Sequence, residues 1–261
     1  MLIKGAGDLA SGVAARLHRC GVAVVMTELP EPLMVRRTVC FGEAVYEGEA
    51  AVEDIVARRV PDVAGARAAL AERVIPVLVD PEASCRGELV PDVLIDGIMA
   101  KRNTGTTRAD APRVIGLGPG FTAGADCHAV VETQRGHWLG RVYWRGSALP
   151  DTGTPGEIGG TVVAGRVLRA PTDGILEARA AIGDRVTTEQ VIATVAGSEL
   201  RAGCDGVLRG LIRSGTRVAA GVKIGDIDLR AERAYCFTIS DKSLAVGGGV
   251  LEAILAETQK N

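Results

Sequence analysis

Apolar runs alternate with helix-like segments through the first 145 residues of the chain. Strand-like runs lie at residues 22–26, 75–79, 93–99 and 113–117, and a short helix is predicted at residues 64–73. Strands that alternate with helices in this way are typical of a parallel sheet covered by helices. We therefore predict an α/β domain with a mostly parallel sheet.

The first apolar strand runs directly into a glycine turn and an amphipathic helix. Gly5 and Gly7 fit the spacing G-x-G-x-x-G/A, and Glu28 ends the second strand 21 residues after Gly7. Glycine allows the backbone to approach a phosphate, the N–H groups of a helix start attract the anion, and an acid after the second strand can hold a ribose hydroxyl. The pattern predicts a Rossmann-like nucleotide site; the alternative is a tight turn without a ligand.

Asp8 places a negative charge where a pyrophosphate would lie at the helix start. Like charges repel each other there. Either Asp8 is an N-cap, or the ligand brings a metal ion or hydroxyl groups to this position. Ordinary NAD binding is therefore not the first choice.

Two further loops would lie at the same sheet edge as the glycine turn, because parallel strands end at one edge. One loop is cationic, the other, at residues 116–124, is rich in glycine, and two arginines after the second strand could grip phosphate or carboxylate. The alternative is solvated charge and plain turns. The predicted ligand-binding residues are Gly5, Gly7, Asp8, Glu28, Arg36, Arg37, Lys101, Arg102, Asn103, Gly118, Gly120 and Thr122.

The second half of the chain contains an internal repeat, in which residues 170–176 recur as residues 202–208 and residues 183–186 as 215–218. Two such β-rich halves resemble the hammerhead of biotinyl and lipoyl domains, a barrel-sandwich hybrid. The turn between the halves, residues 196–201, contains no lysine. We therefore expect no biotin or lipoate and interpret this part as a docking or structural module.

The predicted domains are a Rossmann-like domain at residues 1–165, an inserted barrel-sandwich hybrid at 166–230, and a C-terminal segment at 231–261. In that segment a strand is predicted at residues 235–239. Ser240 and Asp241 can cap a terminal helix whose apolar stripe packs back on the α/β domain.

Composition excludes several classes of protein. A net charge of -2 and 3% aromatic residues disfavour nucleic-acid binding. No apolar run reaches the roughly 18 residues of a membrane span, and no signal peptide is evident, so we expect a cytoplasmic protein without a membrane partner. The 6 cysteines form no C-x-x-C pair, so neither a disulfide framework nor a structural zinc site is expected.

Cys127 and His128 are the candidate metal ligands, since a thiolate facing the crevice would suit molybdenum or a pterin dithiolene. A buried cysteine is the alternative. No nucleophile elbow, P-loop or metalloprotease motif is present. Asp96, Asp126 and Glu132 have two interpretations, as acids or bases or as ordinary structural residues.

Motifs along almost the whole chain resemble the YqeB family of selenium-dependent molybdenum hydroxylase accessory proteins. The resemblance implies a role beside hydroxylases of the xanthine dehydrogenase type, in maturing or inserting their cofactor, and it supplies no catalytic residues. Leu229 stands where the family pattern has proline. The matching segments are residues 3–10, 35–39, 103–105, 116–121, 126–133, 135–142, 166–171, 224–228, 239–242 and 247–255.

The leading hypothesis is a non-catalytic accessory protein that binds molybdopterin, its dinucleotide form or a related anionic, nucleotide-like ligand. The hammerhead would dock a molybdenum hydroxylase apoenzyme, and a second copy of the chain is a possible further partner. The rival hypothesis is an NAD(P)-dependent oxidoreductase, and the third is a scaffold in which the glycines serve only turns.

Overall fold

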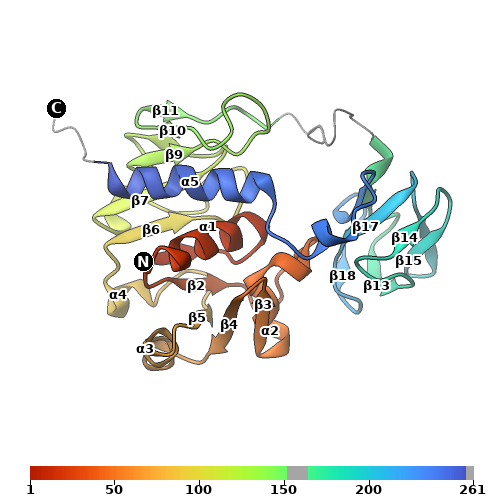
Figure 1. The fold of residues 1–261 in the computed structure, drawn as a ribbon, viewed down its shortest axis with the longest axis horizontal. Helices are drawn as coiled ribbons and strands as arrows, with labels where there is room; N and C mark the ends of the chain where they lie inside the picture. Colours follow the sequence, from red (N-terminus) through yellow and green to blue (C-terminus); the bar gives the residue numbers. More distant parts are fainter. Residues whose placement is uncertain (152–163, 257–261) are drawn as a thin grey trace. The chain divides into compact units, whose positions relative to one another are not determined.

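The computed structural model describes residues 1–151 and 164–256, which divide into two compact units (Figure 1). Unit 1 comprises Met1–Pro32, Phe41–Thr152 and Ile239–Asn261, and unit 2 comprises Leu33–Cys40 and Gly153–Thr238. Unit 2 thus includes residues 33–40 and 231–238, which the sequence pattern assigned to the α/β part and the C-terminal segment.

Unit 1 is built on a nine-stranded sheet with the order β10-β9-β7-β6-β1-β2-β5-β4-β3. The seven strands from β4 to β9 in this order are parallel, which confirms the predicted sheet type, while β3 and β10 are antiparallel to their neighbours. The order reverses between β1 and β6, because β2 to β5 all lie on one side of β1 and the later strands β6, β7, β9 and β10 lie on its other side. The strands are β1 (Leu2–Lys4), β2 (Val25–Glu28), β3 (Glu49–Val52), β4 (Ile55–Val60), β5 (Ile75–Val79), β6 (Val93–Asp96), β7 (Arg113–Leu117), β9 (Ala129–Val131) and β10 (Val142–Tyr143).

The two long helices of unit 1, α1 (Asp8–Arg19) and α5 (Asp241–Leu255), lie side by side across the sheet (Figure 1). Glycine makes this close packing possible, because a Cβ on Gly12 would overlap the Cβ of Ser243. Unit 1 also contains α2 (Ala44–Glu47), α3 (Val63–Ala71), α4 (Arg86–Leu89) and a small sheet of β8 (Thr122–Ala123) and β11 (Gly146–Ser147). None of the helices in the described ranges has the length and apolar character that crossing a membrane requires.

Both ends of α5 are held by side chains. Ser240 is the N-cap, as predicted, and its Oγ accepts a hydrogen bond from the Ser243 N–H at 3.1 Å.

The predicted strand at residues 235–239 is wrong. The chain forms a 3₁₀ turn over Arg233–Cys236, which begins where the Glu232 carboxylate accepts a hydrogen bond from the Ala234 N–H. This local hydrogen bond from the backbone to the side chain stabilises the turn, although the apolar residues of the segment favour a strand.

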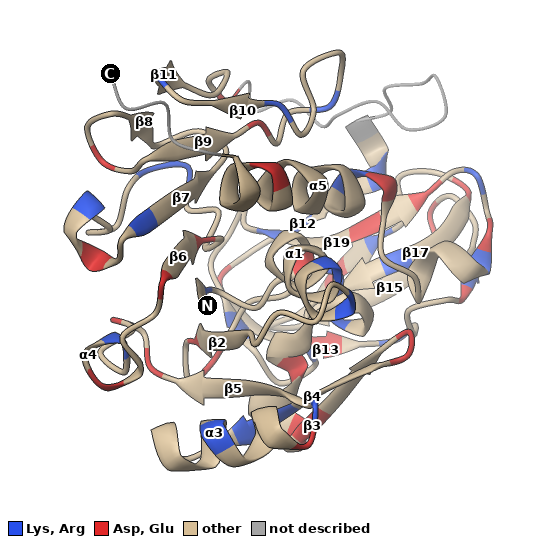
Figure 2. Cartoon of the chain, turned by 60° about the vertical axis from the view of Figure 1, so that its left-hand side comes forward, with Lys and Arg blue, Asp and Glu red and all other residues tan. Residues whose placement is uncertain are grey.

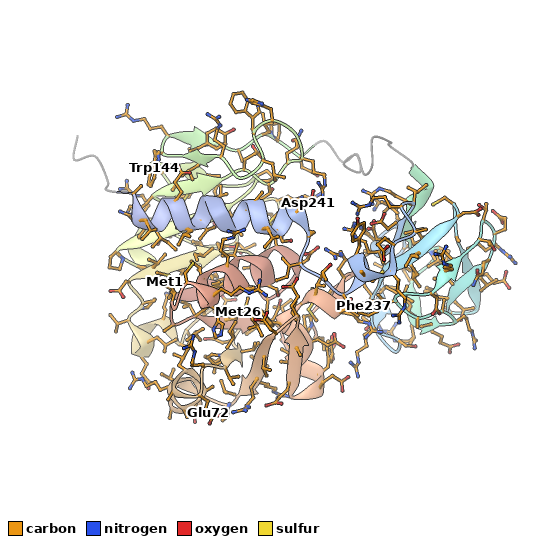
Figure 3. All side chains as sticks on the ribbon, viewed as in Figure 1. Met1, Met26, Glu72, Trp144, Phe237 and Asp241 are labelled. Atoms are coloured by element: carbon orange, nitrogen blue, oxygen red, sulfur yellow. The ribbon has the colours of Figure 1, made fainter. Side chains whose placement is uncertain are left out.

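We expect Arg113→Ala to lower the free energy of unfolding of unit 1 by about 1.5 to 3 kcal/mol, the range for a hydrogen bond to a charged group. Arg113 Nη1 donates to the carbonyl oxygens of Ala253, Ile254 and Ala256 at 2.6, 3.0 and 2.9 Å. It therefore places a cation at the negative end of α5, beside Trp144 (Figure 3). Urea denaturation followed by tryptophan fluorescence measures the loss, and Arg113→Lys should recover part of it; a loss below about 0.5 kcal/mol would contradict this role.

Unit 2 consists of two four-stranded antiparallel sheets, with the orders β12-β19-β17-β14 and β16-β15-β13-β18. The long strand that opens each repeat pairs with the short strand of the other repeat, β13 with β18 and β17 with β14. Apolar side chains of both sheets form one buried cluster, so neither repeat could bury its apolar face alone. The strands are β12 (Val167–Arg169), β13 (Gly174–Ala178), β14 (Arg185–Val186), β15 (Val191–Val195), β16 (Ser198–Arg201), β17 (Gly206–Leu211), β18 (Arg217–Val218) and β19 (Lys223–Asp228).

Ion pairs at the end of β19 form a buried network in unit 2. Arg166 lies 2.7 Å from Asp226, and Asp228, which is fully buried, lies 3.0 Å from Arg209 and 2.6 Å from Arg230. Buried charges are tolerated when partners of opposite sign satisfy them. Figure 2 shows that acidic and basic residues are otherwise interspersed over both units.

Candidate functional site

The glycine turn joins β1 to α1 at the point where the strand order of the sheet reverses. Gly5 has a φ of +87°, and a Cβ there would lie 3.1 Å from the backbone of Gly97, which follows β6. Gly7 differs, because no atom lies within 4 Å of a Cβ built on it. Gly5 is therefore required by the turn, whereas Gly7 leaves open space at the start of α1. In open α/β sheets, ligands bind outside the carboxyl ends of the strands at such a reversal.

Glu28 ends β2 and folds back onto the glycine turn. Its Oε1 accepts a hydrogen bond from the Ala6 N–H at 2.9 Å, and its Oε2 accepts one from the Leu29 N–H at 2.6 Å. Burial raises the pKa of the Glu28 carboxyl, against the opposing effect of these two hydrogen bonds. The structure thus brings the predicted acid and the predicted turn into direct contact.

Asp8 is not the N-cap of α1, which corrects one of the two interpretations of this residue. Gly7 occupies the N-cap position without a side-chain hydrogen bond, and Asp8 is the first residue of the helix. The Asp8 carboxylate instead accepts a hydrogen bond from Ser243 Oγ of α5 at 2.9 Å. The acid therefore links the starts of two adjacent helices, where the positive ends of their dipoles stabilise it.

The loops after β6 and β7 contact each other, as expected from a shared sheet edge. Gly120 has a φ of +108°, and a Cβ there would lie 2.6 Å from the backbone of Arg102. Gly118, with a φ of +73°, leaves room for the Thr133 hydroxyl that follows β9. These two glycines therefore allow three neighbouring loops to pack closely.

Other predicted ligand residues of these loops have partners within the protein. Asn103 Oδ1 accepts hydrogen bonds from the N–H groups of Gly105 and Thr106, so its side chain shapes the loop. The ammonium of Lys101 lies 2.6 Å from Asp151 at the surface, and the Thr122 hydroxyl shares a hydrogen bond with Ser147. Arg102 is exposed, and its backbone lies against Gly120.

Arg36 and Arg37 fall in unit 2, whereas the sequence pattern grouped them with the glycine turn. Arg36 is buried, and its Nη2 donates to the carbonyl oxygens of Tyr235 at 2.9 Å and Thr238 at 3.3 Å. The chain leaves unit 1 after Pro32 and returns at Phe41, so both arginines lie in a short segment that belongs to unit 2. The apolar pattern of the sequence did not reveal this segment. Arg36 thus stabilises the chain of unit 2.

The environments of Cys127 and His128 do not favour metal binding. Cys127 is fully buried, and burial raises the pKa of its thiol to about 11, which keeps it protonated. His128 Nδ1 accepts a hydrogen bond from the Val114 N–H at 2.9 Å. Across residues 1–151 and 164–256, no three His, Cys, Asp or Glu side chains are grouped so that they could hold a metal ion.

Two of the carboxylates that the sequence left unassigned have structural roles. Glu132 is fully buried, and it accepts hydrogen bonds from the N–H groups of Thr133, Gln134 and Leu149. Asp126 accepts one from the Thr122 N–H at 2.8 Å. Glu132 therefore organises the loop that follows β9, and Asp126 organises the turn that precedes this strand.

Sequence analysis missed a buried polar cluster formed by Lys4, Asp96 and Thr106. Lys4 and Asp96 end the neighbouring strands β1 and β6 and are directly paired in register. Lys4 Nζ donates to Thr106 Oγ1 at 2.8 Å, and this hydroxyl donates to Asp96 Oδ2 at 2.6 Å. A lysine in an apolar strand, immediately before a glycine turn, was the signal in the sequence that could have revealed it.

The fold and site together define an α/β protein whose glycine turn lies at the reversal of an open parallel sheet, with a second, antiparallel β unit. No model of a known protein family matches the chain. The chain is 48% identical over 255 residues to the uncharacterized protein YqeB of Escherichia coli (strain K12), which covers 98% of this chain and 47% of that protein. The chain therefore belongs to the YqeB family and spans about half the length of this relative.

Some solved structures show partial likeness at TM-scores of 0.23 to 0.25. They are an aspartoacylase family protein from Mesorhizobium loti, with 20% identity over 25% of this chain and 23% of that chain, and a succinylglutamate desuccinylase/aspartoacylase from Rhodobacter sphaeroides, with 17% identity over 52% and 57%. The third is the ectoine utilization protein EutE (DoeB) from Ruegeria pomeroyi, with 13% identity over 82% and 61%. At these scores no function is transferred.

Proposed function

We propose that unit 1 binds the anionic, nucleotide-like part of molybdopterin or its dinucleotide form, and that the protein handles this cofactor during maturation of selenium-dependent molybdenum hydroxylases. The observation that carries the proposal is the contact between the Glu28 carboxylate and the Ala6 N–H, beside the open space at Gly7. A Rossmann-like site places an acid, a glycine turn and a helix start in this arrangement to hold a ribose and a phosphate.

The residues of the turn suit a phosphate-bearing ligand despite the negative charge of Asp8. Ser243 Oγ donates to Asp8 Oδ1, so part of that charge is satisfied within the protein. The start of α1 still offers its N–H groups beside Gly7, which has a φ of -74° and no side chain to obstruct a phosphate. Cofactor chemistry would belong to the bound pterin, and the protein's part is to bind and orient it.

Unit 2 would serve as the docking module for the hydroxylase apoenzyme in the cytoplasm. The exchange of strands between its two repeats is the arrangement expected of a barrel-sandwich hybrid of the hammerhead type. A tight turn at Ala196 and Gly197 joins β15 to β16, and it offers no lysine for biotin or lipoate. A docking role is therefore proposed rather than that of a covalently loaded carrier.

Gly7→Val tests the proposed nucleotide site. Because Gly7 has a φ of -74°, valine fits the backbone, but its side chain enters the space at the start of α1. We expect the affinity for cytidine diphosphate, measured by calorimetry, to fall at least about tenfold, which is about 1.4 kcal/mol. Gly87→Val is the matched control, since a Cβ there also meets no atom within 4 Å, and it should leave the affinity unchanged.

Mass spectrometry of the small molecules retained by the purified protein identifies the ligand class. A pterin or cytidine nucleotide would support the proposal. Equal affinity of the wild type and Gly7→Val would contradict it. Retention of NAD(P), with turnover of a nicotinamide cofactor, would instead favour the oxidoreductase hypothesis.

A further inference from the structure

Lys4 is a buried ammonium with an incomplete set of partners. Its residue exposure is 7%, and its interactions with other described residues are one hydrogen bond, to Thr106 Oγ1 at 2.8 Å, and the Asp96 carboxylate at 3.8 Å. An ammonium carries three N–H donors. Two of these three N–H groups therefore have no hydrogen-bond acceptor among residues 1–151 and 164–256. Leaving the N–H groups of a buried charged group unsatisfied costs free energy.

The Thr106 hydroxyl lies between Lys4 and Asp96, which form an ion pair at 3.8 Å without a direct hydrogen bond. It accepts from Lys4 and donates to Asp96 Oδ2 at 2.6 Å, while Asp96 Oδ1 accepts from the Ile98 N–H at 3.2 Å. A charged N–H···O contact is ordinarily 2.7 to 2.9 Å long. At 3.8 Å the charge of Lys4 is compensated by Asp96 less strongly than in a directly hydrogen-bonded pair.

The surrounding loop fixes this arrangement. Asn103 holds Thr106 through two hydrogen bonds, from the Thr106 N–H at 2.8 Å and to the Thr106 carbonyl at 2.7 Å. Met99 and Lys101, in the same loop, have φ values of +62° and +61°, a left-handed conformation that non-glycine residues seldom adopt. Such strain is retained where the surrounding structure fixes it, and it concentrates at ligand sites.

The cluster lies at the carboxyl ends of β1 and β6, where the strand order reverses. Gly5 and Gly97 follow Lys4 and Asp96 directly, and the Gly97 N–H donates to the Lys4 carbonyl at 2.9 Å. The ammonium of Lys4 thus lies at the position where an open α/β sheet takes its ligand.

We propose that Lys4 binds an oxyanion, a phosphate or a carboxylate, of the ligand at this reversal, with Thr106 and Asp96 as its positioning residues. The proposal rests on the proposed function of unit 1 and adds a second anion-binding position to the start of α1. The oxyanion accepts hydrogen bonds from the two N–H groups of Lys4 that do not bond to Thr106. The ion pair with Asp96 allows the ammonium to remain buried when the ligand is absent.

Calorimetric titration with inorganic pyrophosphate, succinate and cytidine diphosphate tests the proposal. We expect Lys4→Met to weaken at least tenfold the affinity for whichever of these probes the wild type binds. Arg58→Met should change the same affinity less than twofold. Arg58 of β4 is the charge control, because its side chain is partly exposed and pairs with Glu49 of β3 and with Glu72, which caps the end of α3. Pyrophosphate and succinate distinguish a phosphate position from a carboxylate position.

Thr106→Val and Thr106→Ser test positioning. Valine removes the hydroxyl and should weaken anion binding, whereas serine keeps it and should restore the affinity to within about threefold of the wild type. If Lys4→Met does not fold because Asp96 is left unpaired, Lys4→Met combined with Asp96→Asn replaces it and carries the same expected loss.

The outcomes separate this inference from the proposed function. If Gly7→Val loses cytidine diphosphate binding while Lys4→Met keeps all affinities within twofold, the inference is overturned and the proposed function stands. If Lys4→Met loses anion binding and Gly7→Val does not, the Lys4 position stands without the glycine turn. If the wild type binds none of the three probes, both are overturned, and water satisfies the ammonium.

Discussion

Asp228→Asn is expected to destabilise unit 2 by about 3 to 5 kcal/mol, the cost of removing one partner from a buried ion pair. The Asp228 carboxylate is fully buried and accepts hydrogen bonds from Arg209 at 3.0 Å and Arg230 at 2.6 Å. Asparagine has nearly the same shape but no charge, so the buried guanidinium of Arg209 loses a counter-ion. Hydrogen exchange of the β17 and β19 amides measures the effect, because both tryptophans of the chain, Trp138 and Trp144, lie in unit 1.

The destabilisation should depend on pH with a definite sign. Burial alone would raise the pKa of Asp228, but hydrogen bonds from Arg230 and Arg209 outweigh it and lower the pKa below the ordinary value. A carboxyl whose pKa is lower in the folded state contributes stability above its unfolded pKa, about 3.9, and loses it as the pH falls further. The difference in the free energy of unfolding between the wild type and Asp228→Asn should therefore be largest at pH 7 and shrink as the pH falls below about 4.

Glu177→Gln is the control for this prediction. Glu177 pairs with Arg179 in the same unit, but its side chain is 63% exposed, and an exposed pair contributes about 0 to 1 kcal/mol. Arg209→Met in the Asp228→Asn background should recover part of the stability, since it removes a buried cation that has lost one of its two counter-ions and keeps only Asp226 at 3.6 Å. A loss below about 1 kcal/mol for Asp228→Asn would show that the network tolerates the missing charge.

Gly249→Ala should destabilise unit 1 by at least about 3 kcal/mol, the upper part of the range for overpacking a core. Gly249 lies on the buried face of α5, where a Cβ would overlap the carbonyl oxygen of Gly140 and lie 2.8 Å from a methyl group of Val131. Relief requires that α5 move away from β9, because the backbone of Gly140 cannot rotate aside as a side chain can. Urea denaturation followed by tryptophan fluorescence measures the loss.

Gly248→Ala is the matched control, one residue earlier in the same helix. A Cβ on Gly248 meets no atom within 4 Å, so alanine there should stabilise the protein by about 0.5 to 1 kcal/mol through its higher helix propensity. Opposite signs at adjacent glycines would separate close packing from propensity. Equal effects of the two substitutions would refute the close contact of α5 with Gly140.

Local patterns in the sequence were sufficient to predict several elements. The apolar runs at β5 and β7 match the observed strands, Ser240 caps α5, and the glycine turn is followed by α1. The run at residues 93–99 was too long, because the strand ends at Asp96 and the loop beyond it turns left-handed at Met99. Apolar periodicity predicts burial, and it does not show where strand hydrogen bonding ends.

The sequence by itself determined the parallel sheet, the position of the glycine turn with Glu28 as its acid, and the repeat in the second half, since these depend on periodicity and spacing within short segments. Only the tertiary structure decided that Arg36 and Arg37 belong to unit 2, that Asp8 bonds to Ser243, and that Lys4 lies beside Asp96. These contacts join residues far apart in the chain. They follow from the order of strands in the sheet and the packing of α5 on α1, which no local pattern encodes.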